Sequence, residues 1–273
     1  MRHARQHQLG QNRIMYAKRR PSWLFVLVLT LLLLPGCAGW RPVKVPMDTR
    51  FEASACLSRP DTLLVFLPGA YSHPDEFDRE GFVQAVRARK LAADMLLVDA
   101  HMGYYNGRSI LERLHQDVIV PARARGYNKV WLVGISVGGF GSFLYADDQP
   151  QQVDGIVAIA PYLGGPALSR EIKGAGGLLA WTPATAMPAG AEQVIEQRVW
   201  RWLQHQNGPL DGKKLPPVYL GYATEDRFAL SHQILAAALP SGQVFTTAGG
   251  HDWPAWRRLW RSLLEVLPLA RCG

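Results

Sequence analysis

The sequence predicts an α/β protein with a mostly parallel central sheet and helices on both faces. Short runs of leucine, isoleucine and valine alternate along the chain with amphipathic segments of helical period. The apolar runs lack the polar alternation of a half-exposed strand, so we expect them to be buried on both faces, as in parallel sheets. Near the middle of the chain, one such run leads through a glycine-rich turn into a helix.

The expected elements follow one another in the order of a parallel sheet. Strands are expected at 62–67, 94–99, 130–133, 155–160, 218–222 and 243–247, and helices at 76–91, 109–125, 139–145, 230–239 and 253–267. Strand and helix alternate, which favours helical crossovers between parallel neighbours. Breakers end several elements, as Pro68 and Gly69 end the first strand and Gly126 ends the second helix.

One region interrupts the alternation and is expected to be a cap insertion at about 162–217. It contains four residues of the pattern Gly-Ala-Gly-Gly, several prolines and one amphipathic helical stretch at 192–204. Loops of this length inside a compact domain are uncommon and often functional. Trp181, Trp200 and Trp202 fit either the roof of an apolar pocket or plain packing of the insertion onto the core.

Length and charge bound the possibilities. The 273 residues suit one large domain with its own core. Six of the 30 basic residues precede residue 37, where there is no Asp or Glu, and the remainder carries 24 basic and 22 acidic side chains. Such a balance predicts no binding of nucleic acid. Metal, redox and phosphate-loop motifs are absent from the sequence, so we expect no metal and no other cofactor.

The first 36 residues have the pattern of an export signal. A basic Lys18-Arg19-Arg20 precedes an apolar run at 23–34, which is shorter than the ~20 residues of a membrane-spanning helix. The sequence Leu-Pro-Gly-Cys37 then resembles the lipobox of bacterial lipoproteins, although its proline departs from the pattern. This resemblance implies lipidation of Cys37. Residues 38–50 are rich in proline and charge, so we expect a tether at 37–50 and a domain at 51–273. An ordinary signal peptide and an uncleaved anchor remain the alternatives.

The same resemblance implies a location. The residue after Cys37 is Ala38 rather than Asp, which favours an outer-membrane lipoprotein facing the periplasm, held to the membrane by its lipid. The basic stretch is long for a signal sequence, so Met15 is an alternative start to Met1. In an oxidising compartment Cys56 and Cys272 form an even pair for a disulfide, with two free thiols as the alternative.

The glycine-rich turn carries the chemistry. Gly134-Ile135-Ser136-Val137-Gly138 fits the pattern G-x-S-x-G between a strand and a helix. A serine at such a turn is strained, and its neighbours two residues away must be small because a Cβ there would collide with adjacent backbone. The helix N-terminus directs the amide of Val137 at negative charge beside Ser136. This stretch resembles the nucleophile elbow of the α/β-hydrolase superfamily. Without the rest of the chain, the pattern favours a tight structural turn over a nucleophile.

The resemblance to the α/β-hydrolase fold implies an acid after a late strand and a histidine after the last strand. Asp226 follows the strand at 218–222, and His251 follows the strand at 243–247. Glu225 is the competing acid, while Asp252 is expected to cap the next helix. We therefore expect a Ser136, His251 and Asp226 triad.

The fold also implies a second amide for the oxyanion hole, in the loop after the first strand. Ala70 is the expected donor beside Val137, although Pro68 replaces the histidine that usually precedes the glycine of this loop. His73 and His101 lie in loops at the same edge and are expected to line the pocket.

The segment 250–256, Gly-His-Asp-Trp-Pro-Ala-Trp, is similar to the histidine loop of esterases related to esterase D and feruloyl esterases. The resemblance implies a serine hydrolase that cleaves small-molecule or lipid carboxylic esters in the cell envelope through an acyl-enzyme. A thioesterase, a lipase or an acyltransferase fits the same triad. A non-catalytic binding or assembly lipoprotein is the alternative from a different class.

Overall fold

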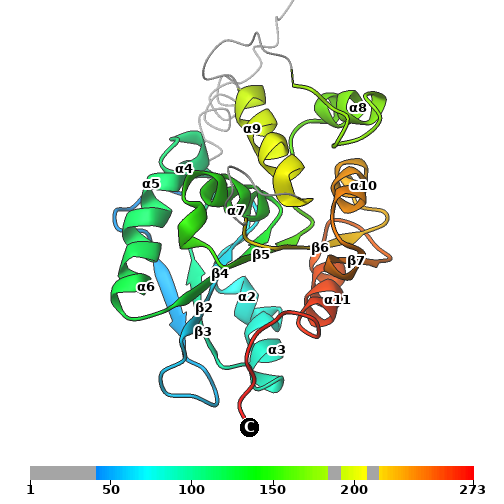
Figure 1. Ribbon diagram of the computed structural model, residues 1–273. Coiled ribbons are helices and arrows are strands. Elements are labelled where there is room, and N and C mark those ends of the chain that lie inside the picture. Colours follow the sequence, from blue (N-terminus) through cyan, green and yellow to red (C-terminus); the bar gives the residue numbers. More distant parts are fainter. Residues whose placement is uncertain (1–40, 184–191, 208–214) are drawn as a thin grey trace, which may run out of the picture. The chain divides into compact units, whose positions relative to one another are not determined.

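Seven strands form one sheet in the order β1-β3-β2-β4-β5-β6-β7 in a computed structural model that describes residues 41–183, 192–207 and 215–273 (Figure 1). β1 runs antiparallel to β3, and all other neighbours are parallel. The strands are β1 (Thr49–Glu52), β2 (Thr62–Leu67), β3 (Ala93–Val98), β4 (Lys129–Ile135), β5 (Gly155–Ile159), β6 (Val218–Ala223) and β7 (Val244–Thr247). The expected mostly parallel sheet is confirmed.

The central strands are buried on both faces, as their composition predicts. In β2, Leu63, Val65 and Leu67 belong to one core, and Leu64 and Phe66 belong to the other. All six residues of this strand are buried. The two cores explain why these strands show a continuous apolar run instead of an alternating pattern.

Helices cover both faces of the sheet (Figure 1). One face carries α2 (Glu76–Arg79), α3 (Phe82–Ala88) and α11 (Trp253–Leu263). The other carries α4 (Met102–Asn106), α5 (Ile110–Arg113), a π-helical turn (Leu114–Ile119), α6 (Val120–Ala124), α7 (Val137–Asp148) and α10 (Ala229–Ala238). The loops that follow the parallel strands at their carboxyl ends therefore share one edge of the sheet, where α/β proteins place their sites.

One of the expected helices is divided in two, and the helix expected at 253–267 already ends at Leu263. The single helix expected at 76–91 is two short helices, because Gly81 between them has a φ of 83°. That left-handed conformation ends α2 and costs glycine little. The helix expected at 109–125 is continuous through α5, the π-helical turn and α6.

The start of the domain also differs from expectation. Residues 41–50, expected to belong to a tether, lie against the domain. Met47 is buried, and β1 pairs Thr49 with Val98 at the edge of the sheet. The sequence did not indicate that this segment packs on the domain, because it is rich in proline and charge and only one of its residues is buried and apolar. The leader, Met15 and Cys37 lie outside the described residues.

In its described residues, the expected insertion contains two α-helices where the sequence indicated one, α8 (Pro166–Gly174) and α9 (Glu192–Gln204). α9 packs on α7 (Figure 1). Trp181, Trp200 and Trp202 are all buried in the core on this face. The indole N–H of Trp200 donates to the carbonyl of Leu163 at 2.7 Å. Packing, rather than the roof of a pocket, is thus the role of these tryptophans.

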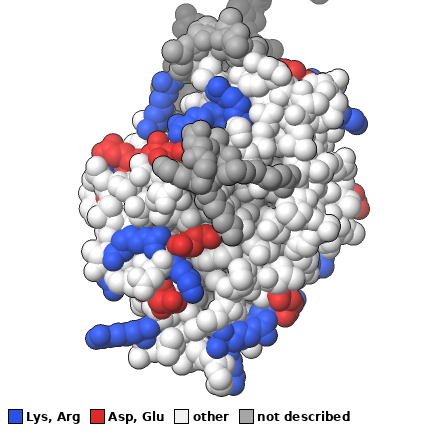
Figure 2. Space-filling view, in the orientation of Figure 1, with Lys and Arg blue, Asp and Glu red and all other residues white. Residues whose placement is uncertain are grey.

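Covalent and surface features complete the domain. Cys56 and Cys272 form a disulfide that joins the segment before β2 to the C-terminal tail. On the face in Figure 2, basic and acidic side chains are scattered among larger uncharged areas. None of the helices in the described ranges is long and apolar enough to cross a membrane.

Candidate active site

A sharp turn between β4 and α7 lifts Ser136 above the sheet edge. Ser136 has a φ of 54° and a ψ of −117°, a strained conformation for a residue with a side chain. A Cβ at Gly134 would lie 2.4 Å from the carbonyl carbon of Gly138, and a Cβ at Gly138 would lie 2.1 Å from the carbonyl oxygen of Leu67. Both glycines are therefore required by close backbone contacts.

Backbone hydrogen bonds hold this turn on both sides. The N–H of Ser136 donates to the carbonyl of Ile159 at 3.0 Å, and the carbonyl of Ser136 accepts from the N–H of Tyr162 at 2.9 Å. These bonds connect the turn to the end of β5. These two hydrogen bonds hold the backbone of Ser136 in its strained conformation at the edge of the sheet.

Ser136, His251 and Asp226 lie in hydrogen-bonded sequence. His251 Nε2 is 3.0 Å from Ser136 Oγ, and His251 Nδ1 is 2.7 Å from Asp226 Oδ2. The three residues come from the turns after β4, β7 and β6. The structure thus brings together the three side chains that the sequence placed at separate strand ends.

The environment keeps Asp226 ionised. Burial by itself opposes the charge, but hydrogen bonds from His251 and from the N–H of Phe228 outweigh it and hold the pKa of Asp226 below its usual value. The second oxygen, Oδ1, accepts from Phe228 N–H at 2.8 Å. A carboxylate at Nδ1 requires the proton of neutral His251 to be on that nitrogen, which leaves Nε2 free to accept a proton from Ser136.

The competing side chains lie elsewhere. Glu225 is exposed. Asp252 caps α11 by accepting from the N–H of Ala255 at 3.1 Å, as expected. His101 caps α4 by accepting from the N–H of Gly103, and His73 is an exposed residue that contacts Arg41. Neither His73 nor His101 lines the pocket described below, contrary to expectation.

The loop after β2 lies directly beside the serine. A Cβ at Gly69 would be 3.6 Å from Ser136 Cβ, and the N–H of Ser72 closes a turn onto the carbonyl of Gly69 at 3.1 Å. Ala70 occupies the second position of this turn. Val137 is the first residue of α7, where backbone N–H groups have no partner within the helix. The two expected oxyanion donors therefore belong to segments that meet at Ser136.

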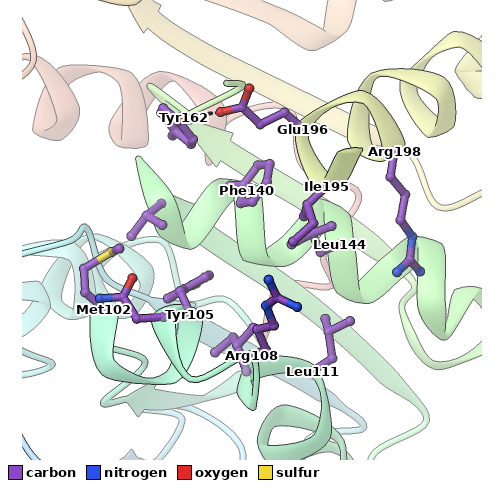
Figure 3. A pocket seen from close by; sticks show the side chains of 13 residues that line it. Met102, Tyr105, Arg108, Leu111, Phe140, Leu144, Tyr162, Ile195, Glu196 and Arg198 are labelled. Carbon is purple, nitrogen blue, oxygen red and sulfur yellow. Dashed lines mark hydrogen bonds between the residues drawn. The ribbon is translucent and has the colours of Figure 1, made fainter. Parts of the chain in front are cut away.

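A mostly apolar cavity of about 360 Å³ has Val137, the residue after Ser136, in its lining. Figure 3 shows the side chains of its walls. Val137 and Tyr162, both linked to the serine turn, form the near end of its lining. Its walls come from α4, α5, α7 and α9, and include Met102, Tyr105, Ile110, Leu111, Phe140, Leu144 and Ile195. Met102 and Tyr105 belong to the sequence His-Met-Gly-Tyr-Tyr at 101–105, and no feature of the sequence marked Phe140 or Ile195 as wall residues.

A buried carboxylate orders one wall of the cavity. Glu196 on α9 accepts from the hydroxyl of Tyr162 at 2.5 Å (Figure 3). It also accepts from the N–H of Gly165 at 3.2 Å. The Tyr162 ring in turn packs edge-on against Phe140 and Phe228. α9 is therefore tied through one side chain to the loop that also holds the serine turn.

Two residues near the triad were missed by sequence reasoning. Phe228 donates its N–H to Asp226, and its ring centre is 5.1 Å from that of His251. An aspartate followed two residues later by a turn N–H is a recognisable Asx turn, so this signal was present. His232 is fully buried, its Nε2 is 2.9 Å from the carbonyl of Pro161, and burial lowers its pKa to about 4.

Comparison with known proteins agrees with this architecture. Residues 111–210, less than half of the chain, match a family model described as serine aminopeptidase, S33. The matched segment includes the Ser136 turn and ends before Asp226 and His251. No curated protein matches the chain in sequence.

Solved structures share the fold at low sequence identity. Est1E from Butyrivibrio proteoclasticus, solved with ferulic acid bound, is 12% identical, with a TM-score of 0.51 over 80% of this chain and 94% of that one. S-formylglutathione hydrolase from Staphylococcus aureus is 13% identical, with a TM-score of 0.50 over 76% and 80% of the two chains. A ferulic acid esterase is 13% identical, with a TM-score of 0.50 over 77% and 84%. The chain thus has an α/β-hydrolase fold.

Proposed function

We propose that this protein is a serine hydrolase that cleaves carboxylic esters through an acyl-enzyme. The observation that carries the proposal is the continuous contact from Ser136 Oγ through His251 to Asp226, with distances of 3.0 Å and 2.7 Å. The family model of serine aminopeptidases and the esterases among the structural neighbours support the same class of chemistry.

In the proposed reaction, each step is assigned to one of these residues. Ser136 Oγ attacks the ester carbonyl while its proton passes to His251 Nε2, and the buried Asp226 carboxylate stabilises the resulting imidazolium. The amides of Val137 and Ala70 hold the oxyanion. His251 then protonates the leaving alcohol. In the second half, His251 removes a proton from water, which attacks the acyl carbonyl and releases the acid with Ser136 restored.

The cavity indicates which part of the substrate is recognised. Its walls are mostly aliphatic and aromatic, and its volume is near the lower end of the ~300–1,000 Å³ usual for small-molecule sites. We expect it to take an apolar acyl group of moderate size. Among p-nitrophenyl esters from acetate to palmitate, kcat/KM should be highest between butyrate and octanoate.

Labelling with a fluorophosphonate probe tests the proposal most directly. We expect the wild-type protein to be labelled and to lose its esterase activity, and we expect Ser136→Ala to be neither labelled nor active. Ser142→Ala is a matched control, because that buried serine lies six residues further along, within α7, and donates to the carbonyl of Gly138. A folded wild-type protein without labelling would exclude the hydrolase, and a non-catalytic binding lipoprotein would then be favoured.

Other reactions of an acyl-enzyme are distinguished by the acceptor and the leaving group. Faster cleavage of thioesters than of esters would identify a thioesterase. Glycerol or an amine added to the assay would identify an acyltransferase, since a new acylated product would form. Emulsified long-chain triglyceride separates a lipase. Aminoacyl p-nitroanilides should be included, because the family model is that of a peptidase.

We further propose that the protein is an exported lipoprotein modified at Cys37, on the strength of the leader pattern and of the Cys56–Cys272 disulfide, which suits an oxidising compartment. Three residues separate Cys37 from Arg41, so the connection would be at most about 14 Å of extended chain. Radioactive palmitate should label the wild-type protein but not Cys37→Ser. Equal labelling of both would refute this assignment.

A further inference from the structure

The segment 41–48 is attached along the edge of the sheet that carries the triad. The N–H of Lys44 donates to the hydroxyl of Tyr104 at 3.1 Å, and that hydroxyl donates to the carbonyl of Lys44 at 3.0 Å. The N–H of Met47 donates to Asp117 Oδ2 at 3.0 Å. These contacts hold the segment against α4, which follows β3, and against the π-helical turn.

Arg41, at the start of this segment, joins those two loops. One nitrogen of its guanidinium, Nη2, donates to the carbonyl of Ser72 at 2.9 Å. The other, Nη1, forms an ion pair with Asp99 and is 3.1 Å from Nδ1 of His73. The Arg41 side chain is 23% exposed and that of Asp99 17%, so water screens the pair only in part.

The carbonyl that Arg41 holds belongs to the turn beside the nucleophile. Ser72 closes that turn onto Gly69, and Gly69 lies against Ser136. Ala70, the second oxyanion donor of the proposed function, lies between them. The next residue, Tyr71, is 87% exposed, so its side chain does little to hold the turn in place.

We propose that Arg41 is a positioning residue that holds the turn 69–72, and with it the Ala70 amide, at the distance from Ser136 that an oxyanion requires. This proposal rests on the proposed hydrolase function. Asp99 directly follows β3. The guanidinium therefore connects the turn 69–72, a surface segment that can move, to the end of a strand, which is rigid. A planar guanidinium can bridge two acceptors at once, which a lysine ammonium on a flexible stem does poorly.

The position of the amide affects the transition state more than the bound ester, because the oxyanion exists only after attack. Removing one oxyanion donor costs about 10²- to 10³-fold in kcat, and a misplacement of about 1 Å can cost about 10²-fold. Loss of the Arg41 contacts loosens the turn without deleting the amide. We therefore expect a loss of about 10- to 100-fold in kcat, with KM little changed.

The experiment compares Arg41→Ala and Arg41→Lys with Arg89→Ala in the otherwise complete protein. Arg89 is a matched control, since it is 20% exposed, pairs with Glu265 and donates to the carbonyls of Ala85 and Arg261, away from the triad. The readouts are kcat and KM on a p-nitrophenyl ester, the affinity for a trifluoromethyl ketone that forms a tetrahedral oxyanion on Ser136, and hydrogen exchange of the peptide at 69–73.

For Arg41→Ala we expect the affinity for the ketone to fall by the same factor as kcat/KM, and the 69–73 amides to exchange at least tenfold faster. Arg41→Lys should show a smaller loss, because the ammonium can keep Asp99 but not also reach Ser72. Arg89→Ala should stay within twofold of wild type in all three readouts. A plain loss of folding would change the melting temperature and exchange throughout the domain instead.

Two results would overturn the proposal. One is a folded Arg41→Ala whose kcat and ketone affinity stay within twofold of wild type, and the other is unchanged exchange at 69–73. The hydrogen-exchange measurement does not depend on enzymatic activity. It therefore still tests the contact of Arg41 with the turn if the wild-type protein hydrolyses none of the esters. Inactive wild type with faster exchange in Arg41→Ala would refute the hydrolase and the catalytic consequence but not the structural contact.

Discussion

Replacing Asp226 by asparagine is expected to disable the base while leaving the fold in place. Oδ1 of Asp226 accepts from the N–H of Phe228 at 2.8 Å, and an asparagine must present its carbonyl oxygen there. Its NH₂ group then faces His251 Nδ1, which Oδ2 now contacts at 2.7 Å. Two donors cannot share one hydrogen bond, so the imidazole proton moves to Nε2. That nitrogen faces Ser136 and could no longer take its proton.

The magnitude follows from what is lost. The Asp226 side chain is fully buried, so no water replaces the missing charge beside the imidazolium. A wrong tautomer with the geometry intact costs about 10⁴-fold in kcat in serine proteases, and we expect ~10³- to 10⁴-fold here. At 1.36 kcal/mol per factor of ten, this is about 4 to 5 kcal/mol of transition-state stabilisation.

The assay is the pH dependence of kcat/KM on a p-nitrophenyl ester, with Glu225→Gln as the control for the neighbouring acid. We expect Glu225→Gln to match wild type, because its carboxylate is exposed and outside the triad. Thermal unfolding should show that Asp226→Asn remains folded. The reasoning fails if Asp226→Asn stays within tenfold of wild type, or if Glu225→Gln is the variant that loses activity.

Three further predictions concern the disulfide, the cavity and a buried histidine. The double variant Cys56→Ser, Cys272→Ser should have a free energy of unfolding about 2 to 4 kcal/mol lower than wild type, measured by urea denaturation. If reductant lowered the stability of this double variant as much as that of wild type, the bridge would be contradicted. Leu144→Trp should narrow the cavity and shift the kcat/KM optimum toward acetate, while Leu179→Trp, at a position 67% exposed outside the cavity lining, should leave the optimum unchanged. Burial lowers the pKa of His232 from 6.5 to about 4, so only the unfolded chain gains this proton between those pH values. Stability should therefore be complete above about pH 6.5 and fall toward pH 4, and this fall should be reduced in His232→Asn; an unchanged slope would count against the buried neutral histidine.

Local chemistry explains which parts could be predicted from sequence. The G-x-S-x-G turn requires glycine at Gly134 and Gly138 because of contacts with adjacent backbone, and such contacts leave a signature in residue type. Strands buried on two faces leave a continuous apolar run. Asp226 and His251 were found because each follows its strand directly, and the order of strands along the chain already determines which turns reach the active edge.

The break in the helix at Gly81 and the packing of the insertion left no such signature in the sequence. Gly81 divides a helix whose apolar pattern continues across the break, since the side chains on both sides still face the same core. The tryptophans of the insertion have the same composition whether they roof a pocket or pack in a core. Their role depends on how α9 lies on α7.

The sequence by itself predicted the α/β class and the serine turn from residues a few positions apart, and it predicted the partners of Ser136 from their places after the last two expected strands. Only the tertiary structure decided that the three side chains are within hydrogen-bond distance, that α4, α5, α7 and α9 enclose an apolar cavity, and that Arg41 reaches the turn beside Ser136. Arg41 and Ser72 are 31 residues apart. Contacts at that separation depend on how the whole sheet and its helices pack, and no short stretch of sequence contains that information.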